Sequence, residues 1–268
     1  MLEGKRILVT GVVNDESIAF AVARRALELG AEVLLTAFDR DRERTEEASR
    51  LLPSPVDVLE LDVTRPEHFE VLGDLLHDRW GALDGALHAV AFAPRAALAG
   101  SFLDADLDSV QRAFATSTYS YAALAKLVAR LAPASGAALV GLDFDAAGAW
   151  PVYNCMGVCK AGLEAASRSV ARDLGPAGIR SNLVAAGPLI TRAASGIPEF
   201  ERLTDAWAHR SPVAWDPVDP EPVADSVCYL LSDFARSVTG EILHVDGGYH
   251  AMAAPLAAPP SAVPTAPQ

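Results

Sequence analysis

The sequence contains few cysteines and no long apolar run, and these shortages exclude several classes of protein. Its three cysteines, Cys155, Cys159 and Cys228, form no C-x-x-C pair and predict no disulfide framework. We interpret Cys155 and Cys159, which would share one face of a helix, as small packed residues rather than redox or metal ligands. Because no run of roughly 18 apolar residues is free of charge, and the chain leads straight into structure without a signal peptide, we predict no membrane insertion and a cytoplasmic location.

Positive charge is also scarce, and this scarcity limits the partners of the chain. The formal net charge is −13, whereas nucleic acids and anionic membranes require a basic surface, so we predict neither as a partner. The sequence has no HExxH motif, no Cys-His cluster and no G-x-S-x-G motif, and its six histidines are scattered. It therefore predicts no metal site and gives no support to a hydrolase.

Short β-branched runs alternate with longer helical patterns along the 268 residues. Strands separated by helices predict right-handed βαβ units, and hence an α/β fold: one Rossmann-type, doubly wound domain with a seven-stranded parallel sheet covered on both faces. We expect this domain to span residues 1–250, and the uncharged Ala/Pro-rich segment 251–268 to be a disordered tail. The expected strands are residues 7–10, 33–36, 58–61, 86–90, 138–141, 183–185 and 242–245.

A candidate phosphate-binding turn joins the first strand to the first helix. Gly11 follows the strand and the helix opens near Ser17 and Ile18, where free N–H groups and the positive end of the helix favour a pyrophosphate. The G-x-G-x-x-G fingerprint is missing, because only Gly11 is present, so the loop must be wider and the Ser17 hydroxyl would act in place of a glycine. Taken alone, Ser17 is equally well explained as a helix cap.

Residues after the second and third strands indicate an adenosine site. The aromatic ring of Phe38 would stack on adenine, and Asp39 disfavours a 2′-phosphate, which predicts NADH rather than NADPH, although the adjacent Arg40 points the other way. Asp62 and Val63 follow the third strand at the edge where ligands bind in open α/β sheets. Asp62 would accept from the adenine amino group; its alternative role is to cap the following helix.

Tyr153 and Lys160 stand seven positions apart at the predicted start of a helix. Seven residues are nearly two helical turns, so both side chains share one face, about 10 Å apart along the axis. This arrangement suits a phenol that donates to a reacting oxygen and an ammonium that holds a cofactor hydroxyl. By itself the pair is weak evidence, because a tyrosine and a lysine on one helix face are usually a packed ring and a solvated amine.

Several motifs, in their order and spacing, resemble those of NADH-dependent enoyl-acyl-carrier-protein reductases, particularly the actinobacterial type within the divergent short-chain dehydrogenase/reductase superfamily. The Tyr-x6-Lys spacing is typical of this family, whereas most short-chain dehydrogenases have Tyr-x3-Lys. The likeness runs from about residue 2 to residue 250. The motifs lie at residues 11–20, 35–40, 59–63, 83–88, 141–145, 153–160, 180–188 and 245–248.

The resemblance implies a role for each matching residue. Tyr153 would hydrogen-bond the thioester carbonyl, Lys160 would hold the nicotinamide ribose hydroxyls, and Phe144 would pack near the nicotinamide and the acyl chain. The implied cofactor-binding residues are Gly11, Ser17 and Ile18 at the pyrophosphate, Phe38, Asp62 and Val63 at the adenosine, Val90 and Ala91 at the ribose, and Leu189 and Thr191 beside the nicotinamide and phosphates.

The implied reaction is reduction of the trans-2 double bond of an enoyl thioester, carried by acyl-carrier protein or coenzyme A, in fatty-acid or related acyl-chain biosynthesis. Hydride from NADH would attack the β-carbon, and the phenol would stabilise the enolate more than the ground-state carbonyl. The resemblance also implies a homotetramer, with the helices around residues 109–131 and 153–174 as candidates for subunit packing.

Two departures from the family pattern carry expectations of their own. Ala91 stands where the family has glycine, and a methyl group at this position is expected to weaken NADH binding. Segment 191–210 is expected to form a helical substrate-binding lid whose apolar lining is Ile197, Phe200, Leu203 and Trp207. Because this segment is short, medium-length acyl groups are the predicted substrates.

Charge in the lid bears on the carrier of the acyl group. Acidic carrier proteins need a basic landing site, and the lid offers three arginines offset by three carboxylates: Arg192, Arg202, Arg210, Glu199, Glu201 and Asp205. We therefore expect weak carrier affinity or the use of a coenzyme A thioester. Two other functions stay open: a carbonyl, imine or specialised-metabolism reductase on the same scaffold, and a non-catalytic nucleotide-binding homologue.

Overall fold

A seven-stranded, wholly parallel sheet forms the centre of the molecule in the computed structural model, which describes residues 1–253. The strand order is β3-β2-β1-β4-β5-β6-β7, so the chain starts near the middle and winds outward in both directions. The predicted Rossmann-type, doubly wound fold is confirmed. The strands are β1 Arg6–Val9, β2 Glu32–Ala37, β3 Val58–Glu60, β4 Gly85–His88, β5 Ala137–Asp143, β6 Ile179–Ala186 and β7 Ile242–Val245.

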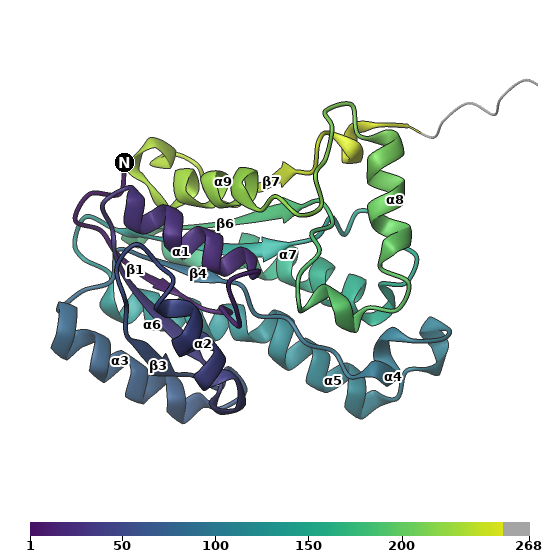
Figure 1. Ribbon diagram of the computed structural model, residues 1–268. Coiled ribbons are helices and arrows are strands. Elements are labelled where there is room, and N and C mark those ends of the chain that lie inside the picture. The colour runs from purple at the N-terminus through teal and green to yellow at the C-terminus, as the bar shows by residue number, and fades with distance from the viewer. Residues whose placement is uncertain (254–268) are drawn as a thin grey trace, which may run out of the picture.

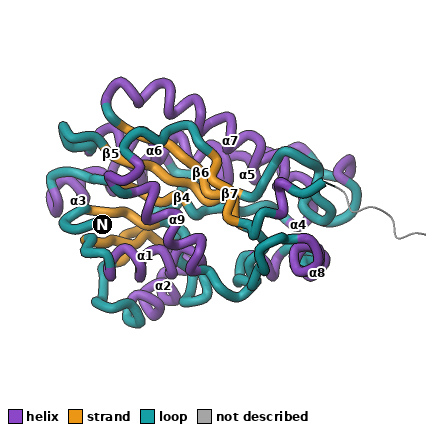
Figure 2. The backbone as a smooth tube through the Cα atoms, turned by 90° about the horizontal axis from the view of Figure 1, so that it is seen from above, coloured by secondary structure: helices purple, strands orange, loops and turns teal. Residues whose placement is uncertain are grey.

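Helices cover both faces of this sheet, as Figure 2 shows for α1 and α2 on one side and α6 and α7 on the other. Parallel strands joined by crossover helices must be covered in this way, because both faces of the sheet are apolar. The helices are α1 Ile18–Glu28, α2 Arg42–Ser49, α3 Pro66–Trp80, α4 Arg95–Leu98, α5 Leu107–Phe114, α6 Ser120–Leu131, α7 Asn154–Leu174, α8 Glu201–Arg210 and α9 Glu221–Leu231.

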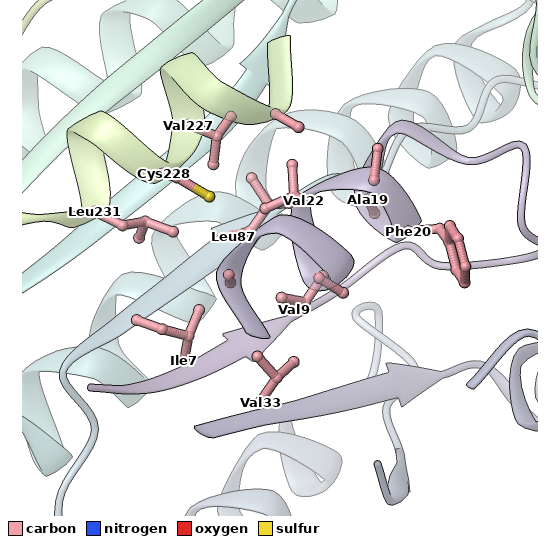
Figure 3. Close-up of a cluster of buried hydrophobic side chains, with 14 of the residues drawn as sticks. Ile7, Val9, Ala19, Phe20, Val22, Val33, Leu87, Val227, Cys228 and Leu231 are labelled. Atoms are coloured by element: carbon pink, nitrogen blue, oxygen red, sulfur yellow. The ribbon is translucent and has the colours of Figure 1, made fainter. Parts of the chain in front are cut away.

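The larger hydrophobic core lies between the sheet and helices α1 and α9 (Figure 3). Ile7 and Val9 of β1 project toward Val22 of α1, and Leu87 of β4 toward Val227 of α9; all five side chains are buried. Full burial of an aliphatic side chain of this size contributes about 1.5–3 kcal/mol. A second core on the opposite face packs α3, α6 and α7 against the same strands. The two cores together fix the sheet on which the loops at its carboxyl edge are built.

Strand β6 is longer than the predicted segment 183–185, because two polar residues inside it are buried and satisfied. The amide of Asn182 donates to the Val238 carbonyl oxygen at 2.9 Å, and its oxygen accepts from the Glu241 N–H at 3.1 Å. The hydroxyl of Ser181 lies 2.8 Å from that of Tyr121. These polar side chains interrupt the apolar run in the sequence but continue the strand in the structure.

The carboxyl ends of the strands point toward α4 and α8, which lie together at one end of the molecule (Figure 1). Helix α8 is held there by aromatic stacking: the rings of Trp207 and Tyr249 are 3.9 Å apart and nearly parallel, at 9°. The Arg210 guanidinium lies 4.6 Å from the centre of the Tyr249 ring and donates to its hydroxyl at 2.9 Å. The lid segment therefore ends in a helix anchored to the chain after β7.

Among residues 1–253, no helix combines the length and apolar character needed to cross a bilayer. Most of the predicted tail 251–268 lies outside the described residues. Its first residues are in contact with α8, because Arg210 donates to the carbonyl oxygens of Met252 and Ala253 at 3.2 and 3.0 Å.

Candidate active site

A large cavity opens along the carboxyl edge of the sheet, at the point where the strand order reverses between β1 and β4. In doubly wound folds this is the position at which dinucleotides bind. The cavity has a volume of about 1930 Å³. Sites for one small ligand typically measure about 300–1,000 Å³, so there is room for a dinucleotide and a second ligand side by side.

The loop after β1 shapes the end of the cavity beside helix α1. Gly11 has φ +84°, and a Cβ atom there would lie 2.1 Å from the Ala89 carbonyl oxygen, so only glycine fits against the end of β4. Gly11 and Ile18 line the cavity. These two predicted residues therefore lie where the helix N-terminus can meet an anion.

Ser17 is placed differently from the expectation. Its hydroxyl oxygen accepts hydrogen bonds from the N–H groups of Val13 and Asn14, at 3.1 and 3.2 Å, and donates to Asn14 Oδ1 at 3.0 Å. Ser17 occupies the N-cap position of helix α1, as the alternative prediction had it, but among the described residues its side chain makes no cap hydrogen bond to that helix. Ser17 holds the glycine-poor loop in shape, while its neighbours Val13 and Ile18 line the cavity.

The adenosine end contains the three predicted residues, Phe38, Asp62 and Val63, in one wall. Phe38 is 40% exposed, and the Arg40 guanidinium lies 5.3 Å from the centre of its ring. One oxygen of Asp62 accepts from the Thr64 N–H at 2.9 Å and from the Thr64 hydroxyl at 2.6 Å. Asp62 thus also organises the turn before α3.

The loop after β4 is fixed by a π-helical turn, η3 (Ala115–Tyr119), that links α5 to α6. Ser117 in this turn accepts from the Phe92 N–H at 2.9 Å and donates to the Phe92 carbonyl oxygen at 3.0 Å. Val90 and Ala91, just before Phe92, line the cavity as predicted. The backbone of Ala91 does not have the positive φ that requires glycine, so an alanine fits there without backbone strain.

Tyr153 and Lys160 lie in the same wall of the cavity, one before helix α7 and one inside it. Both are buried, at 8% and 6% exposure, and the ring of Phe144 lies 4.9 Å from that of Tyr153. Burial raises the pKa of the Tyr153 phenol, and the neighbouring Asp143 adds to this effect, so the phenol stays protonated at neutral pH. The three residues predicted as catalytic are therefore brought together.

The Lys160 side chain is held by a hydrogen bond to the backbone of strand β5. Its Nζ donates to the Leu142 carbonyl oxygen at 2.8 Å. Burial lowers the pKa of its ammonium, whereas the nearby Asp143 carboxyl raises it. An ammonium has three donors, so this hydrogen bond leaves two N–H groups for a ligand.

The backbone on either side of Tyr153 is strained. Val152 and Asn154 have φ of +61° and +34°, in a region that costs a non-glycine residue about 1–3 kcal/mol. The Asn154 amide offsets part of this cost by donating to the carbonyl oxygens of Leu98 and Gly100, at 2.8 and 3.1 Å. The strain and these contacts fix the position of the phenol.

The segment after β6 closes the other side of the cavity. Leu189 lines it, as predicted, while the Thr191 hydroxyl is directed to its own turn, where it accepts from the Ala194 N–H at 3.2 Å. Ile197 and Phe200 line the cavity. The expectation for the other two lid residues is wrong: Leu203 and Trp207 are buried, at 2% and 1% exposure, in the hydrophobic cluster beneath α8.

Sequence reasoning missed two residues that shape this site. Asp143 ends β5 in the cavity wall, buried at 5% exposure. Its signal was available, because a carboxylate directly after a buried strand lies at the edge where ligands bind. The role of Ser117 could not be predicted from the sequence, because a serine within a helical pattern does not indicate a π-helical turn.

The fold and the site together define the class of Rossmann-type, dinucleotide-dependent oxidoreductases. The family model described as "Enoyl-(Acyl carrier protein) reductase" matches residues 11–250, and the chain belongs to this family, as its motifs predicted. The "Enoyl-[acyl-carrier-protein] reductase [NADH]" of Mycolicibacterium smegmatis is 44% identical over 262 residues, covering 92% of this chain and 97% of that protein. The protein of the same name from Mycobacterium avium is 41% identical, with coverage of 92% and 97%. The FabI of Neisseria meningitidis serogroup B is 39% identical, with coverage of 92% and 95%.

Proposed function

We propose that the protein is an NADH-dependent enoyl-thioester reductase that reduces the trans-2 double bond of an acyl chain in fatty-acid or related biosynthesis. The observation that carries this proposal is the group of Tyr153, Phe144 and Lys160 in one wall of a cavity large enough for a dinucleotide and a second ligand. Family membership and the relatives' names support the same reaction. The experiment that tests it is NADH oxidation with trans-2-enoyl thioesters of graded chain length.

The roles of the three residues follow from their chemistry. NADH supplies a hydride to the β-carbon of the enoyl group, and negative charge moves to the thioester carbonyl oxygen. The protonated phenol of Tyr153 donates a hydrogen bond to that oxygen, and this bond strengthens as the enolate forms. Lys160 donates its remaining N–H groups to the ribose hydroxyls and so orients the cofactor. Phe144 packs on Tyr153 and keeps water away from the reacting atoms.

NADH is favoured over NADPH by the pairing of the arginines at the adenosine end. Arg40 and Arg44 both line the cavity and would attract a 2′-phosphate if they were unpaired. Asp41 lies between them, 3.4 Å from Arg40 Nε and 3.5 Å from Arg44 Nη1. Its carboxylate repels a further phosphate, which places Asp41 in the role that the sequence suggested for Asp39.

Replacing Ala91 by glycine is expected to strengthen NADH binding several-fold, because Ala91 lines the cavity where the ribose is proposed to bind and glycine allows a closer approach. The effect corresponds to roughly 0.5–1 kcal/mol, the order of a single methyl contact. NADH fluorescence titration measures it, with Ala96→Gly at an exposed position of helix α4 as the matched control. An unchanged dissociation constant in Ala91→Gly would show that the methyl group does not crowd the cofactor.

The substrates proposed are medium-length enoyl thioesters, with little preference between acyl-carrier protein and coenzyme A. Of the lid arginines, Arg202 is paired with Glu199 at 2.9 Å and Arg210 is engaged by Tyr249, which leaves Arg192 at the cavity. One arginine is a small landing site for an acidic carrier protein. Matched carrier and coenzyme A substrates should therefore give similar kcat/KM values, and a large preference for the carrier would contradict this part of the proposal.

A homotetramer is proposed from apolar side chains left on the surface of the α5–η3 segment and α7. Phe114, Tyr119 and Val158 are 44%, 55% and 48% exposed, and Leu107 at the start of α5 is 69% exposed. Exposed apolar patches of this kind mark protein interfaces. The predicted cytoplasmic location stays a prediction.

Replacing Phe114 by glutamate is expected to convert the tetramer into smaller species, because a charge would be buried at the subunit contact. Light scattering coupled to size exclusion measures the mass. Phe234→Glu is the control, since Phe234 is also an exposed phenylalanine, at 70%, but lies in the short η6 turn (Asp233–Ala235) after α9. A monomeric wild-type protein, or a tetramer that survives Phe114→Glu, would contradict the proposed interface.

A further inference from the structure

The carboxyl group of Asp143 is buried without a partner in the wall of the cavity. Asp143 is the last residue of β5 and is only 5% exposed. Within residues 1–253, neither of its carboxyl oxygens has a hydrogen-bond partner. A buried polar group left without a partner costs about 1–3 kcal/mol, and a buried charge costs more. Such a group at a ligand cavity is therefore a candidate for a partner that the ligand supplies.

Lys160 is the complement of this carboxyl. It is equally buried, lines the same cavity, and donates from Nζ only to the Leu142 carbonyl oxygen, one residue before Asp143. In the described part of the chain, no ion pair within 4.0 Å joins the two groups. The cavity wall thus contains two N–H groups of Lys160 and two carboxyl oxygens of Asp143 that are not used in hydrogen bonds among the described residues. A ligand that meets both must itself donate and accept, as a ribose hydroxyl or a carboxamide does.

We propose that Asp143 is a cofactor-binding residue that accepts a hydrogen bond from the nicotinamide nucleoside of NADH, next to the ligand groups that accept from Lys160. This inference rests on the proposed function, because it names NADH as the ligand of the cavity. The nucleoside carries ribose hydroxyls and a carboxamide N–H₂ group, either of which can donate to a carboxylate. Asp143 accepts most strongly when it is ionised, so bound NADH favours its ionised form.

The charged and titratable groups around Asp143 determine how readily it ionises. Burial raises the pKa of its carboxyl to about 7, and Glu164 of α7 and Asp145 of the following loop add to this rise. Lys160 opposes the rise, as does the neighbouring Phe144 N–H, whose geometry falls outside that of a hydrogen bond. From β4, His88 faces the same region, with Nε2 2.7 Å from the Ser120 hydroxyl, and burial lowers the pKa of its imidazole to about 3. Tyr153 stays protonated, as above. With its pKa raised to about 7, the Asp143 carboxyl changes charge in the neutral range.

The sign of the resulting pH dependence follows from linkage. Without cofactor, Asp143 is ionised above pH 7 and protonated below it. Because NADH favours the ionised form, its affinity is constant above that pH and falls as the pH decreases through it, by up to about tenfold per pH unit. Binding at a pH below 7 must then release a proton from Asp143.

The test measures the dissociation constant of NADH against pH, together with the protons released on binding. Calorimetry in buffers of different ionisation enthalpy counts the protons, and neither readout requires turnover. The wild type is expected to lose about tenfold in affinity between roughly pH 7.5 and 5.5 and to release a proton near pH 6. Asp143→Asn keeps the shape of the side chain but cannot ionise, so it is expected to bind more weakly at high pH, without pH dependence and without proton release.

Two control variants assign the titration to a position. Asp145→Asn removes a carboxyl two residues away that helps to raise the pKa of Asp143, so it is expected to keep the wild-type slope with the midpoint moved to lower pH. His68→Asn tests the proposed adenosine end, where His68 Nδ1 accepts from the Asp62 N–H at 3.1 Å. It is also expected to keep the slope.

The outcomes separate this inference from the proposed function. NADH binding with no pH dependence, or with the same slope in Asp143→Asn, would overturn the role of Asp143 while leaving the reductase proposal intact. A slope lost in His68→Asn would do the same. A wild-type protein that binds no NADH at any pH would overturn both. If Asp143→Asn folds poorly, the wild type still tests the inference, because NADH binding near pH 6 without proton release would overturn it.

Discussion

Tyr153→Phe is expected to lower kcat for enoyl-thioester reduction by about 10²–10³-fold, the usual effect of removing one donor to a developing oxyanion. NADH affinity should change little, because the phenylalanine ring still packs on Phe144, 4.9 Å away in the wild type. The loss falls on kcat because the hydrogen bond is stronger to the enolate than to the carbonyl of the bound substrate. Steady-state kinetics with a trans-2-enoyl thioester and a separate NADH titration measure the two effects.

The matched control is Tyr229→Phe, which removes a phenolic hydroxyl from a 38% exposed residue on α9, outside the cavity. Its kcat should equal that of the wild type. If Tyr153→Phe also retained full activity, the hydrogen bond from the phenol to the substrate would be ruled out, and another donor would have to stabilise the enolate.

Trp207→Ala is expected to lower the free energy of unfolding by about 3–5 kcal/mol, as for other fully buried aromatic residues. The indole is 1% exposed and touches three other rings: its centre lies 3.9 Å from that of Tyr249, 5.0 Å from that of Trp150 and 5.6 Å from that of Phe144. Its removal leaves a large hole between α8 and the loop that carries Tyr153. Urea denaturation of the purified protein measures the loss.

Trp207→Phe is the control for this prediction. It keeps an aromatic ring in the stack and removes the indole N–H, which has no hydrogen-bond partner among residues 1–253. An unpartnered buried donor costs about 1–3 kcal/mol, so its removal offsets part of the lost contact area. The phenylalanine variant should therefore lose less than half of what the alanine variant loses. Equal losses in both would show that the indole N–H is satisfied.

The sheet was predictable because its information is local and repeated. Each strand appears in the sequence as a short apolar run between helical patterns, and parallel strands with crossover helices admit few arrangements. The boundaries were less predictable where polar residues are buried. Ser181 and Asn182 belong to β6 because Tyr121, Val238 and Glu241 satisfy them, and these partners are distant in sequence.

The site was predictable where a residue's position at a strand end decides its role. Gly11, Phe38, Asp62, Val90 and Lys160 follow strands or face their ends, and all five line the cavity.

The role of a site residue was not predictable where its side chain can hydrogen-bond either to a ligand or within its own loop. The hydroxyls of Ser17 and Thr191 bond to Asn14 and Ala194 in their own turns, a choice set by loop geometry. Trp207 belongs to the core because Tyr249, in the chain after β7, stacks on it. A contact between residues far apart in the sequence produces no local sequence pattern from which it could be predicted.

Enoyl-thioester reduction with Tyr153 as the hydrogen-bond donor is tested most directly by one measurement. Purified protein is incubated with NADH and a trans-2-enoyl coenzyme A of medium chain length, and NADH loss is compared with the saturated acyl thioester formed. We expect one saturated thioester to form for each NADH lost, and the rate to be greatly reduced in Tyr153→Phe. NADH that binds but is never oxidised by any enoyl thioester, while a ketone or imine is reduced instead, would contradict it.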